Sequence, residues 1–342
     1  MKTDPKNILI RDFDYDLPQE KIADFPLASR DQSKLLVYRD GQITDDHFYN
    51  LSQNIPEGST LVVNDTRVIE ARILFQKPTG GIIEIFCLEA NGQPVERSLA
   101  QTGKVQWQCL IGGASKWKPG QLLHKKLMIA GREIILTGKY ISREPEHFII
   151  EFSWEPPDLP FADIIHAAGA IPLPPYIKRE VTEMDSERYQ TIFSRQEGSV
   201  AAPTSALHFT QAVFDSLAKK NIAVERITLH VGAGTFKPVK TDTIADHSMH
   251  REPFSVKMEA LKKIIACESL IAVGTTSLRT LESLHWIAIK LMKGLIKEDW
   301  ELHQWEAYDL DAQFPGINSH ESLQFLLHWM KENNVEEIHC YT

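Results

Sequence analysis

The chain has 342 residues, of which 43% are apolar and 24% are charged, and its formal net charge at pH 7 is −9. This length favours about two domains, and the composition is that of an ordinary globular protein. No apolar run is long enough to span a bilayer and the N-terminal residues lack the apolar stretch of a signal peptide, which favours the cytoplasm. The scattered cysteines (87, 109, 267 and 340) are typical of reduced thiols there.

The first strong pattern in chain order is a strand followed by a run of short β-type segments. TLVVNDT (60–66) predicts a strand that ends in a polar turn. From about residue 70, strand-like runs recur between turns rich in Gly, Pro and Asn, and no helical period interrupts them. These runs are ARILF, GIIEIFCLE, VQWQCLIG, QLLHKKLMIA, EIILTG and HFIIEFS. Such spacing predicts a small barrel or sandwich.

Beyond residue 153 the pattern changes to strands that alternate with helices. FTQAVFDSLAKKN (209–221) predicts a helix with Thr210 as its N-cap, and VERITLHVGAGT (224–235) predicts a strand leading into a glycine turn. LIAVGTT (270–276) predicts another strand, which leads into a long amphipathic helix. We therefore predict an α/β fold in which a barrel-like α/β domain, residues 1–70 and 153–342, is interrupted by an inserted all-β small barrel domain, residues 71–152.

Positive charge is concentrated within the predicted insertion. Residues 103–143 contain eight Lys or Arg and one acid, a net charge of +7 that leaves −16 for the rest of the chain. This asymmetry is typical of a face that binds a polyanion, and a solvated, lysine-rich β-surface would give the same pattern. The densest stretch is KWKPGQLLHKK (116–126), where the indole of Trp117 could stack on a base or pack beneath the lysine stems.

Three predicted strand ends carry polar or glycine-rich motifs. In parallel α/β sheets, ligands bind beyond the carboxyl ends of the strands. The motifs are NDTR (64–67), GAGT (232–235) and GTTS (274–277), the last at a helix N-terminus with Arg279 one turn further on. Each motif alone is also explained as ordinary connection chemistry. The small, hydroxyl-rich stretch SVAAPTSALHFT (199–210) has neither helical nor strand periodicity and predicts the wall of a ligand pocket.

HSMHREP contains His247, His250 and Glu252, which are suitable ligand types for zinc. The stretch has no nearby cysteine and no second paired-histidine motif, so we predict no metal. Hydrogen bonding or proton transfer by one of these histidines is the favoured interpretation.

These motifs resemble the S-adenosylmethionine:tRNA ribosyltransferase-isomerase family of queuosine biosynthesis. The resemblance covers about the first 285 residues and is carried by long strings in the family's order: DFDYDLP (12–18), RDQSKLLV (30–37), LVVNDTRVIEAR (61–72), IPLPPYIKR (171–179), ERYQTIFS (187–194), GSVAAPTSALHFT (198–210), TLHVGAGTFKPV (228–239), HSMHREPF (247–254) and AVGTTSLRTLES (272–283). It implies an α/β domain with a β-barrel inserted after NDTRV.

The resemblance implies transfer and isomerisation of the ribosyl group of S-adenosylmethionine onto 7-aminomethyl-7-deazaguanine at the tRNA wobble position. Epoxyqueuosine forms, and adenine and methionine are released. S-adenosylmethionine is then a consumed substrate, with no cofactor expected. The expected partners are S-adenosylmethionine and the anticodon stem-loop of tRNA, with no membrane and a monomeric enzyme.

Within the matching motifs, the titratable catalytic candidates are Asp65, His208, His230 and His250. The substrate-binding candidates are Arg67, Thr204, Ser205, Gly232, Gly234, Thr235, Thr275, Thr276 and Arg279. The RNA-binding candidates are Lys116, Trp117, Lys118, Lys125 and Lys126. The individual proton-transfer steps are left unassigned among the four titratable residues.

The sequence departs from the family near its end. The family continues with a Pro-Gly-Tyr turn, an Asn-Phe-His-Leu-Pro-type segment and a Tyr-Gly-Asp stretch, whereas this chain has the helical ESLQFLLHWMKENN and then EEIHCYT (336–342), the start of a strand. This predicts a truncated chain, a natural fragment or a divergent relative. The alternatives to the enzyme are a non-catalytic RNA-binding relative and an unrelated α/β enzyme that binds a sugar phosphate at GAGT and GTTS.

Overall fold

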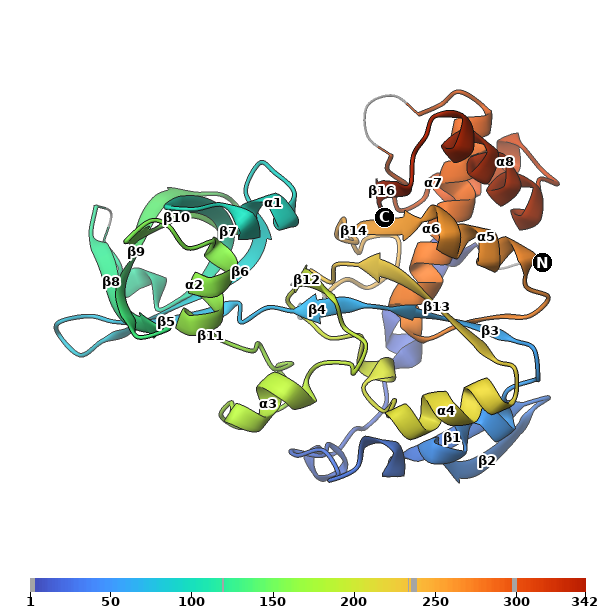
Figure 1. The fold of residues 1–342 in the computed structure, drawn as a ribbon, viewed down its shortest axis with the longest axis horizontal. Coiled ribbons are helices and arrows are strands. Elements are labelled where there is room, and N and C mark those ends of the chain that lie inside the picture. The colour runs from blue at the N-terminus through green and yellow to red at the C-terminus, as the bar shows by residue number, and fades with distance from the viewer. Residues whose placement is uncertain (1–3, 119, 233, 235–238, 297–299) are drawn as a thin grey trace. The chain divides into compact units, whose positions relative to one another are not determined.

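The computed structural model describes residues 4–118, 120–232, 234, 239–296 and 300–342 (Figure 1). The chain divides into two compact units. Unit 1 comprises Met1–Thr66, Gln190–Gln196 and Pro203–Thr342, and unit 2 comprises Arg67–Tyr189 and Glu197–Ala202. An insertion at 71–152 remains a prediction, and the seven-stranded sheet that contains those residues lies within unit 2.

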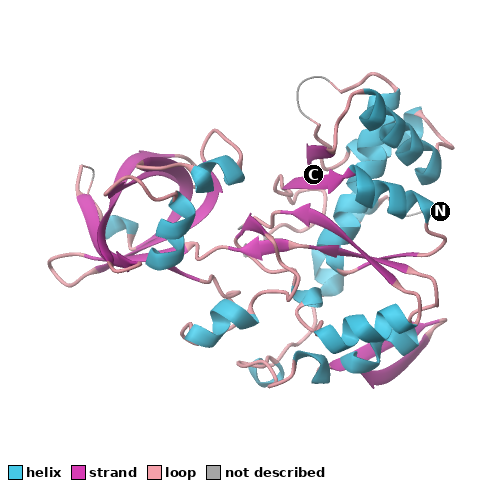
Figure 2. Cartoon of the chain, in the orientation of Figure 1, coloured by secondary structure: helices cyan, strands magenta, loops and turns pink. Residues whose placement is uncertain are grey.

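A five-stranded sheet forms the centre of unit 1 (Figure 2), in the order β15-β3-β13-β14-β16. Its strands are β3 (Thr60–Asn64), β13 (Ala223–Leu229), β14 (Pro253–Lys257), β15 (Leu270–Ala272) and β16 (Glu337–Tyr341). β3 runs parallel to both β13 and β15, and β14 is antiparallel to β13 and β16. The three predicted strand ends therefore meet at one edge, as expected, and 336–342 does form a strand.

The predicted barrel-like closure of this sheet is wrong for the described residues. The sheet order runs from β15 at one edge to β16 at the other, so the sheet is open. The physical reason is the antiparallel β14, because a closed parallel barrel needs a helical crossover between each strand and the next.

Helices of unit 1 pack on the open sheet and on one another. They are α4 (Gln211–Lys219), α5 (Met258–Ala266), α6 (Gly274–Met292), α7 (Glu306–Gln313) and α8 (Ser319–Glu332). The predicted helix over 209–221 is confirmed as α4, and the long amphipathic helix predicted after LIAVGTT is confirmed as α6. The Thr210 hydroxyl caps α4 by accepting from Val213 N at 3.3 Å. α6 packs on β3, β13 and β15 and also contacts α8.

The core of unit 1 explains why β3 is completely buried. Leu61 and Val63 of β3 pack with Phe209 and with Val213 and Leu217 of α4. Because strand side chains alternate between faces, Val62 and Asn64 are directed to the opposite face of the sheet. The polar Asn64 is therefore buried at the end of the central strand.

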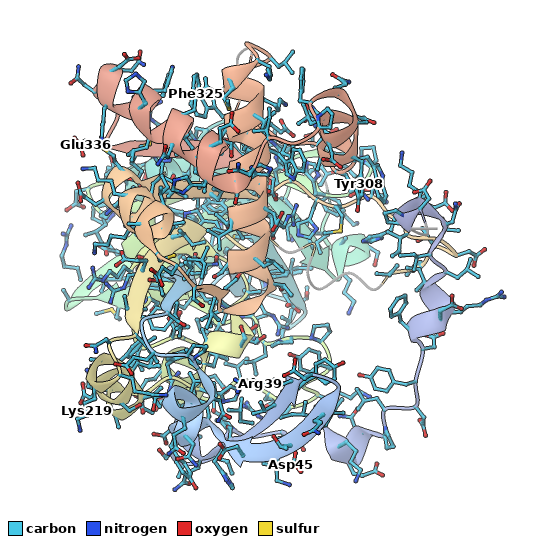
Figure 3. The ribbon with its side chains drawn as sticks, turned by 90° about the vertical axis from the view of Figure 1, so that its right-hand side faces the viewer. Arg39, Asp45, Lys219, Tyr308, Phe325 and Glu336 are labelled. Carbon is cyan, nitrogen blue, oxygen red and sulfur yellow. The ribbon has the colours of Figure 1, made fainter. Side chains whose placement is uncertain are left out.

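A β-hairpin, β1 (Lys34–Arg39) with β2 (Gln42–His47), lies near the N-terminus of unit 1. Its turn, Asp40-Gly41, has φ of 51° and 81°, the left-handed pair that favours this dipeptide in two-residue hairpins. Figure 3 shows Arg39 and Asp45 on this hairpin, together with Tyr308 of α7 and Phe325 of α8.

Unit 2 contains a curled, antiparallel seven-stranded sheet in the order β11-β5-β6-β7-β10-β9-β8 (Figure 1). Its strands are β5 (Arg72–Gln76), β6 (Ile82–Ala90), β7 (Lys104–Gly112), β8 (Leu122–Ile129), β9 (Arg132–Arg143), β10 (Phe148–Glu155) and β11 (Gly169–Ala170). The six strand-like runs between 71 and 153 are thus confirmed as β5 to β10. A separate two-stranded sheet pairs β4 (Thr66–Val68) with β12 (Gln196–Ser199).

Helices also occur in unit 2, and the expectation of no helix between the strand-like runs is wrong. α1 (Val95–Ala100) interrupts them, and α2 (Phe161–Ala168) and α3 (Glu183–Arg188) follow the sheet. α1 is only six residues long, too short to show a helical period in the sequence. Phe161 of α2 is fully buried against the rings of Trp107, Phe152 and Trp154.

All four cysteines are free thiols, as expected. Cys87 and Cys109 are fully buried in unit 2 and face each other across β6 and β7, while Cys340 is buried in unit 1 and Cys267 is partly exposed. Within the described residues, none of the helices combines the length and apolar character needed to cross a bilayer.

Candidate functional site

Asn64 joins the ends of β3 and β13. Its side-chain amide donates to the Leu229 carbonyl at 2.9 Å, and its Oδ1 accepts from Leu229 N at 3.0 Å and Thr66 N at 3.1 Å. A buried amide with its donor and acceptor both used fixes the register of the two strands. The residues that follow Asn64 therefore have defined positions.

Asp65 is a buried carboxyl at the end of β3, 7% exposed. The Thr228 hydroxyl donates to its Oδ1 at 2.7 Å. Burial raises the pKa of Asp65, against the lowering effects of the Thr228 hydrogen bond and of the positive charge of Arg226. A carboxyl with a raised pKa is a stronger base than an exposed one, as proton transfer requires.

His230 lies at the end of β13 and is 7% exposed. Its Nδ1 is 3.0 Å from the hydroxyl of Thr66, and its main-chain NH donates to the Pro253 carbonyl at 3.0 Å. The second contact attaches this strand end to the residue after Glu252. Asp65, Thr66 and His230 are therefore brought together, as the strand-end motifs predicted.

Glu252 is the centre of a second group of contacts beside β14, and only 3% of it is exposed. Its Oε1 accepts from Gly232 N and from His250 Nε2, both at 3.0 Å. Its Oε2 accepts from Arg279 Nη1 at 2.9 Å. Two predicted binding residues and one predicted catalytic residue thus share one carboxylate.

Arg279 holds this group to the rest of unit 1. Besides Glu252, it donates through Nη2 to the carbonyl oxygens of His250 at 2.9 Å and Thr342 at 3.2 Å. Burial lowers the pKa of this guanidinium, and the charge of Glu252 acts in the opposite direction. The Nη atoms of Arg279 are thus engaged within the chain. We call the group formed by Asn64, Asp65, Thr66, Thr228, His230, Gly232, His250, Glu252 and Arg279 the strand-end site.

Close packing at Gly274 brings two other predicted motifs together. A Cβ at Gly274, whose φ is 87°, would lie 2.3 Å from the hydroxyl oxygen of Ser205. The start of α6, with Thr275 and Thr276, is therefore adjacent to the Thr204–Ala206 turn. The hydroxyl of Thr276 is buried and has no hydrogen-bond partner in the described part of the chain.

His208 has different neighbours from the strand-end site. Its ring lies 5.4 Å from that of Phe48, and it hydrogen-bonds with the backbone of Arg30. Burial lowers the pKa of His208, so its imidazole is neutral at pH 7. A neutral ring can accept a proton, as the predicted catalytic role requires, and the same ring packs against Phe48 at the edge of the core.

Two other substrate-binding candidates are Arg67 and Thr235. Arg67 belongs to unit 2, where its guanidinium lies 3.6 Å from the carboxylate of Glu197. Thr235 lies outside the described residues.

We call residues 116–126, which contain the predicted RNA-binding residues, the lysine segment. Its lysines differ in exposure and in internal partners. Lys116 and Lys118 are exposed. Lys125 is half-buried and donates to the Leu74 carbonyl at 3.1 Å, and Lys126 pairs with Glu133 at 3.3 Å. Burial lowers the pKa of Lys125.

Trp117 is 7% exposed, and its indole NH donates to the Gln121 carbonyl at 2.8 Å. Its ring packs edge-on against Tyr140. Stacking of this indole on a base therefore does not fit the structure, and packing inside unit 2 does. The sequence could not distinguish these roles because lysines flank both exposed and buried aromatic residues.

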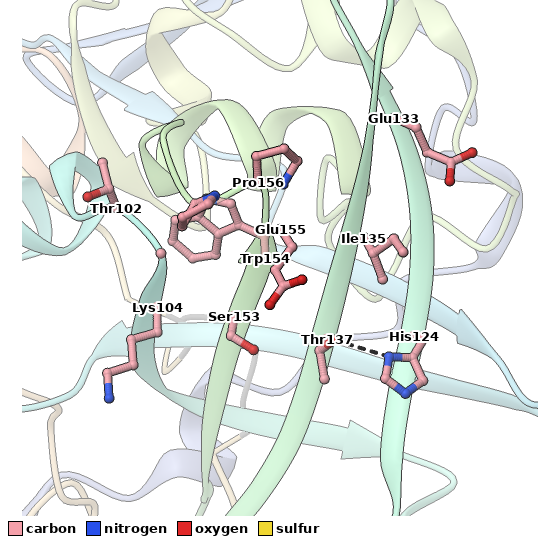
Figure 4. Close-up of a pocket in the computed structure, with 12 residues that line it drawn as sticks. Thr102, Lys104, His124, Glu133, Ile135, Thr137, Ser153, Trp154, Glu155 and Pro156 are labelled. Atoms are coloured by element: carbon pink, nitrogen blue, oxygen red, sulfur yellow. Dashed lines mark hydrogen bonds between the residues drawn. The ribbon is translucent and has the colours of Figure 1, made fainter.

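Each unit contains a cavity of ligand size. In unit 2, a cavity of about 850 Å³ lies over β7, β8, β9 and β10 and is lined by Lys104, His124 and Glu155 among others (Figure 4). In unit 1, a cavity of about 410 Å³ lies between α6 and α7, and Arg279 of the strand-end site lines it. None of the predicted catalytic residues is among the described residues that line either cavity.

Sequence reasoning missed four members of the strand-end site. Glu252 is predicted only as a possible metal ligand, Asn64 and Thr66 belong to the predicted NDTR motif without roles of their own, and Thr228 is not a candidate. A polar residue in an otherwise apolar strand, such as Asn64 in TLVVN, was the available signal. Within the described residues, no group of three or more His, Cys, Asp or Glu is arranged to hold a metal ion.

Comparisons with known proteins relate most of the chain to one family. The family model described as "Queuosine biosynthesis protein" matches residues 10–301. The S-adenosylmethionine:tRNA ribosyltransferase-isomerase of Pelobacter propionicus is 38% identical over 282 residues, which is 80% of this chain and 77% of the relative. The enzyme of the same name from Azoarcus sp. is 40% identical over 278 residues, or 80% and 74% of the two chains.

A solved structure is also similar, that of an S-adenosylmethionine tRNA ribosyltransferase from Thermotoga maritima. It has 25% sequence identity, covers 79% of this chain and 72% of its own, and has a TM-score of 0.32. Residues 302–342, which include α7, α8 and β16, lie beyond the part of the chain that the family model matches.

Proposed function

Because the chain belongs to the family of queuosine biosynthesis proteins, we propose that it transfers and isomerises the ribosyl group of S-adenosylmethionine onto tRNA. The acceptor is the aminomethyl nitrogen of 7-aminomethyl-7-deazaguanine at the wobble position, and the products are epoxyqueuosine, adenine and methionine. S-adenosylmethionine is consumed as a substrate, and no cofactor takes part. The observation that carries the proposal is this family match over residues 10–301.

The strand-end site supplies suitable chemistry for this reaction. The sulfonium acidifies the adjacent 5′ carbon, so a positioned base is needed there, and the departing adenine needs a proton or a hydrogen bond. Asp65 has a raised pKa, and His230 is hydrogen-bonded to Thr66 at 3.0 Å. Both side chains occupy the edge at which parallel sheets bind ligands. We assign proton transfer to this edge and the ribose and adenine contacts to the adjacent Ser205, Thr275 and Thr276.

The curled sheet of unit 2 supports a role in RNA binding. We propose that it is a small barrel, in which β8 returns to β5. The contact of the Lys125 ammonium with the Leu74 carbonyl supports this closure. The exposed Lys116 and Lys118 supply charge for RNA phosphates. The expected partner is the anticodon stem-loop, and the enzyme acts as a monomer in the cytoplasm.

The alternative is a relative that binds RNA without turnover. The segment that follows residue 301 favours it, since α7 and α8 stand there in place of the motifs with which the family ends. The two functions differ in one product, because an RNA-binding protein without turnover releases no adenine.

The decisive experiment is incubation with S-adenosylmethionine and tRNA that carries the 7-aminomethyl-7-deazaguanine precursor. We expect adenine and methionine to be released in equal amounts, as measured by chromatography, with no methyl group on the tRNA. Methylated tRNA would contradict ribosyl transfer, and bound tRNA without adenine would support the non-catalytic alternative. tRNA without the precursor base is the matched control.

A further inference from the structure

The contacts of Glu252 determine which nitrogen of His250 carries a proton. Glu252 is 3% exposed, and three donors surround it: Gly232 N, His250 Nε2 and Arg279 Nη1, all within 3.0 Å. Arg279 is always charged and the peptide NH can only donate, so Glu252 must be the ionised acceptor. An ionised carboxylate has no proton to give, and His250 Nε2 is therefore the donor.

When the ring is neutral, the other nitrogen of His250 carries a lone pair. In a neutral imidazole only one nitrogen is protonated, so Nδ1 is an acceptor when Nε2 donates. In the described part of the chain Nδ1 has no hydrogen-bond partner. The His250 side chain is 30% exposed.

Gly234 lies close against this nitrogen. A Cβ built on Gly234 would lie 2.2 Å from His250 Nδ1, far closer than real side chains approach. The second glycine of the GAGT turn is therefore required by the position of the His250 ring. Gly234 of the GAGT motif and His250 of HSMHREP thus lie side by side.

We propose that His250 Nδ1 is the base that removes the proton from the 5′ carbon of S-adenosylmethionine, and that Glu252 is its positioning residue. The reaction rests on the function proposed above, whereas the ring orientation rests on the contacts alone. The C–H bond breaks, its electron pair remains on the carbon beside the sulfonium, and the proton binds Nδ1. Glu252 then faces an imidazolium and balances its charge, the role that a carboxylate has behind a catalytic histidine.

We assign His250 to the C–H proton because a proton on carbon is the harder of the two to remove. The reaction also needs a neutral amine, but an ammonium loses its proton to water or buffer far more easily than a carbon does. A carboxylate-supported imidazole is therefore best used at the carbon. Arg279, which pairs with Glu252 Oε2, keeps that carboxylate ionised and correctly oriented.

The first test is the nitrogen-15 NMR spectrum of the full chain with labelled histidine, assigned with a His250→Gln variant. We expect the neutral form of the His250 ring to carry its proton at Nε2. A neutral ring protonated at Nδ1 would overturn the proposal. This measurement does not depend on turnover.

The second test is Glu252→Gln, which keeps an oxygen acceptor for Gly232 and His250 but removes the charge. We expect kcat to fall about a hundredfold with little change in KM, and the acidic limb of the pH–rate profile to move to lower pH because the imidazolium loses its counter-charge. A merely structural role would leave that limb in place. Wash-in of deuterium at the 5′ carbon should slow by the same factor.

The matched control is Glu332→Gln, which removes the carboxylate from an exposed pair with His328 (3.1 Å) on α8. It should leave the rate, the profile and the His250 spectrum unchanged. An unshifted acidic limb in Glu252→Gln would overturn the positioning role. If the wild-type chain releases no adenine, the proposed function fails, while the NMR spectrum still decides the pairing of Glu252 and His250.

Discussion

The strand-end site and the lysine segment both present charged side chains, but the strand-end site buries most of them and the lysine segment exposes most of them. Asp65, His230 and Glu252 are each less than a tenth exposed and hydrogen-bonded to named partners. Lys116 and Lys118 extend into solvent from a unit whose interior is apolar. Burying a polar group costs free energy unless its partners are in place, so the strand-end site is a specified arrangement, whereas surface charge alone specifies little.

The sharpest test of this difference is Asp65→Asn. We expect turnover to fall on the order of a thousandfold, because an amide cannot take part in the other proton transfers that we assign to this edge, beside the C–H step given to His250. The folded protein should nevertheless become more stable at pH 7. Burial raises the pKa of Asp65, so the ionised carboxyl lowers the free energy of unfolding at every pH above its ordinary value, and asparagine removes that cost.

Thermal unfolding at pH 7 and near pH 4 measures the stability effect. The two proteins should differ at pH 7 and converge towards pH 4 and below, where Asp65 is protonated in both folded and unfolded states. An activity loss accompanied by lower stability at pH 7 would show that the carboxyl is structural. Thr228→Val, which removes the hydrogen bond to Asp65 but not its charge, is the control.

A smaller effect is expected of His208→Ala, on the order of a hundredfold in turnover if the imidazole serves the chemistry. Because burial lowers the pKa of His208, the unfolded chain binds this proton more tightly than the folded protein. Wild-type stability should therefore decrease as the pH falls below about 6.5, and the variant should lose part of that dependence. Equal loss of activity and stability at pH 7.5 would assign the ring to the core beside Phe48.

The smallest effect is expected for the lysine segment. Replacing Lys116, Lys118, Lys125 and Lys126 by glutamine should weaken tRNA binding about tenfold at moderate salt. Only Lys116 and Lys118 are free of the internal partners that hold Lys125 and Lys126, so the slope of log affinity against log salt should decrease by about 1.4–1.8. Binding of S-adenosylmethionine should not change.

Filter binding over a salt series measures the affinity and the slope. The control is Lys219→Gln with Lys331→Gln, which removes two exposed lysines of unit 1 (Lys219 is labelled in Figure 3). An unchanged slope in the fourfold variant would show that the lysine segment is a solvated surface and that RNA binds elsewhere.

Local pattern was enough to predict most of the elements. The strands β3, β13 and β15, the helices α4 and α6, and the six β-type runs of unit 2 follow from periodicity and turn residues, and the parallel edge follows from their alternation. The sequence could not show that the α/β sheet stays open. The antiparallel pairing of β14, which keeps it open, depends on contacts between residues far apart in sequence.

The sequence motifs predicted several residues of the strand-end site but not the hydrogen bonds that join them. Asp65, His230 and His250 were selected as titratable residues, yet the carboxylate that joins His250 to Arg279 was missed. Glu252 is two residues from one partner and 27 from the other, and nothing in HSMHREP indicates that its glutamate faces inward. Burial of a charged side chain is set by its partners in space, which a single sequence does not display.

The arrangement of the thiols gives each unit its own reporter of opening. Cys87 and Cys109 are buried in the curled sheet of unit 2, and Cys340 is buried in the five-stranded sheet of unit 1. Burial raises the pKa of Cys109 and of Cys340, so both remain thiols, and a thiol reagent needs a thiolate that it can reach. The rate at which a thiol reagent labels each buried cysteine therefore reports the opening of the unit that contains it. Cys267 is partly exposed, so its labelling rate is the reference for a thiol that needs less opening.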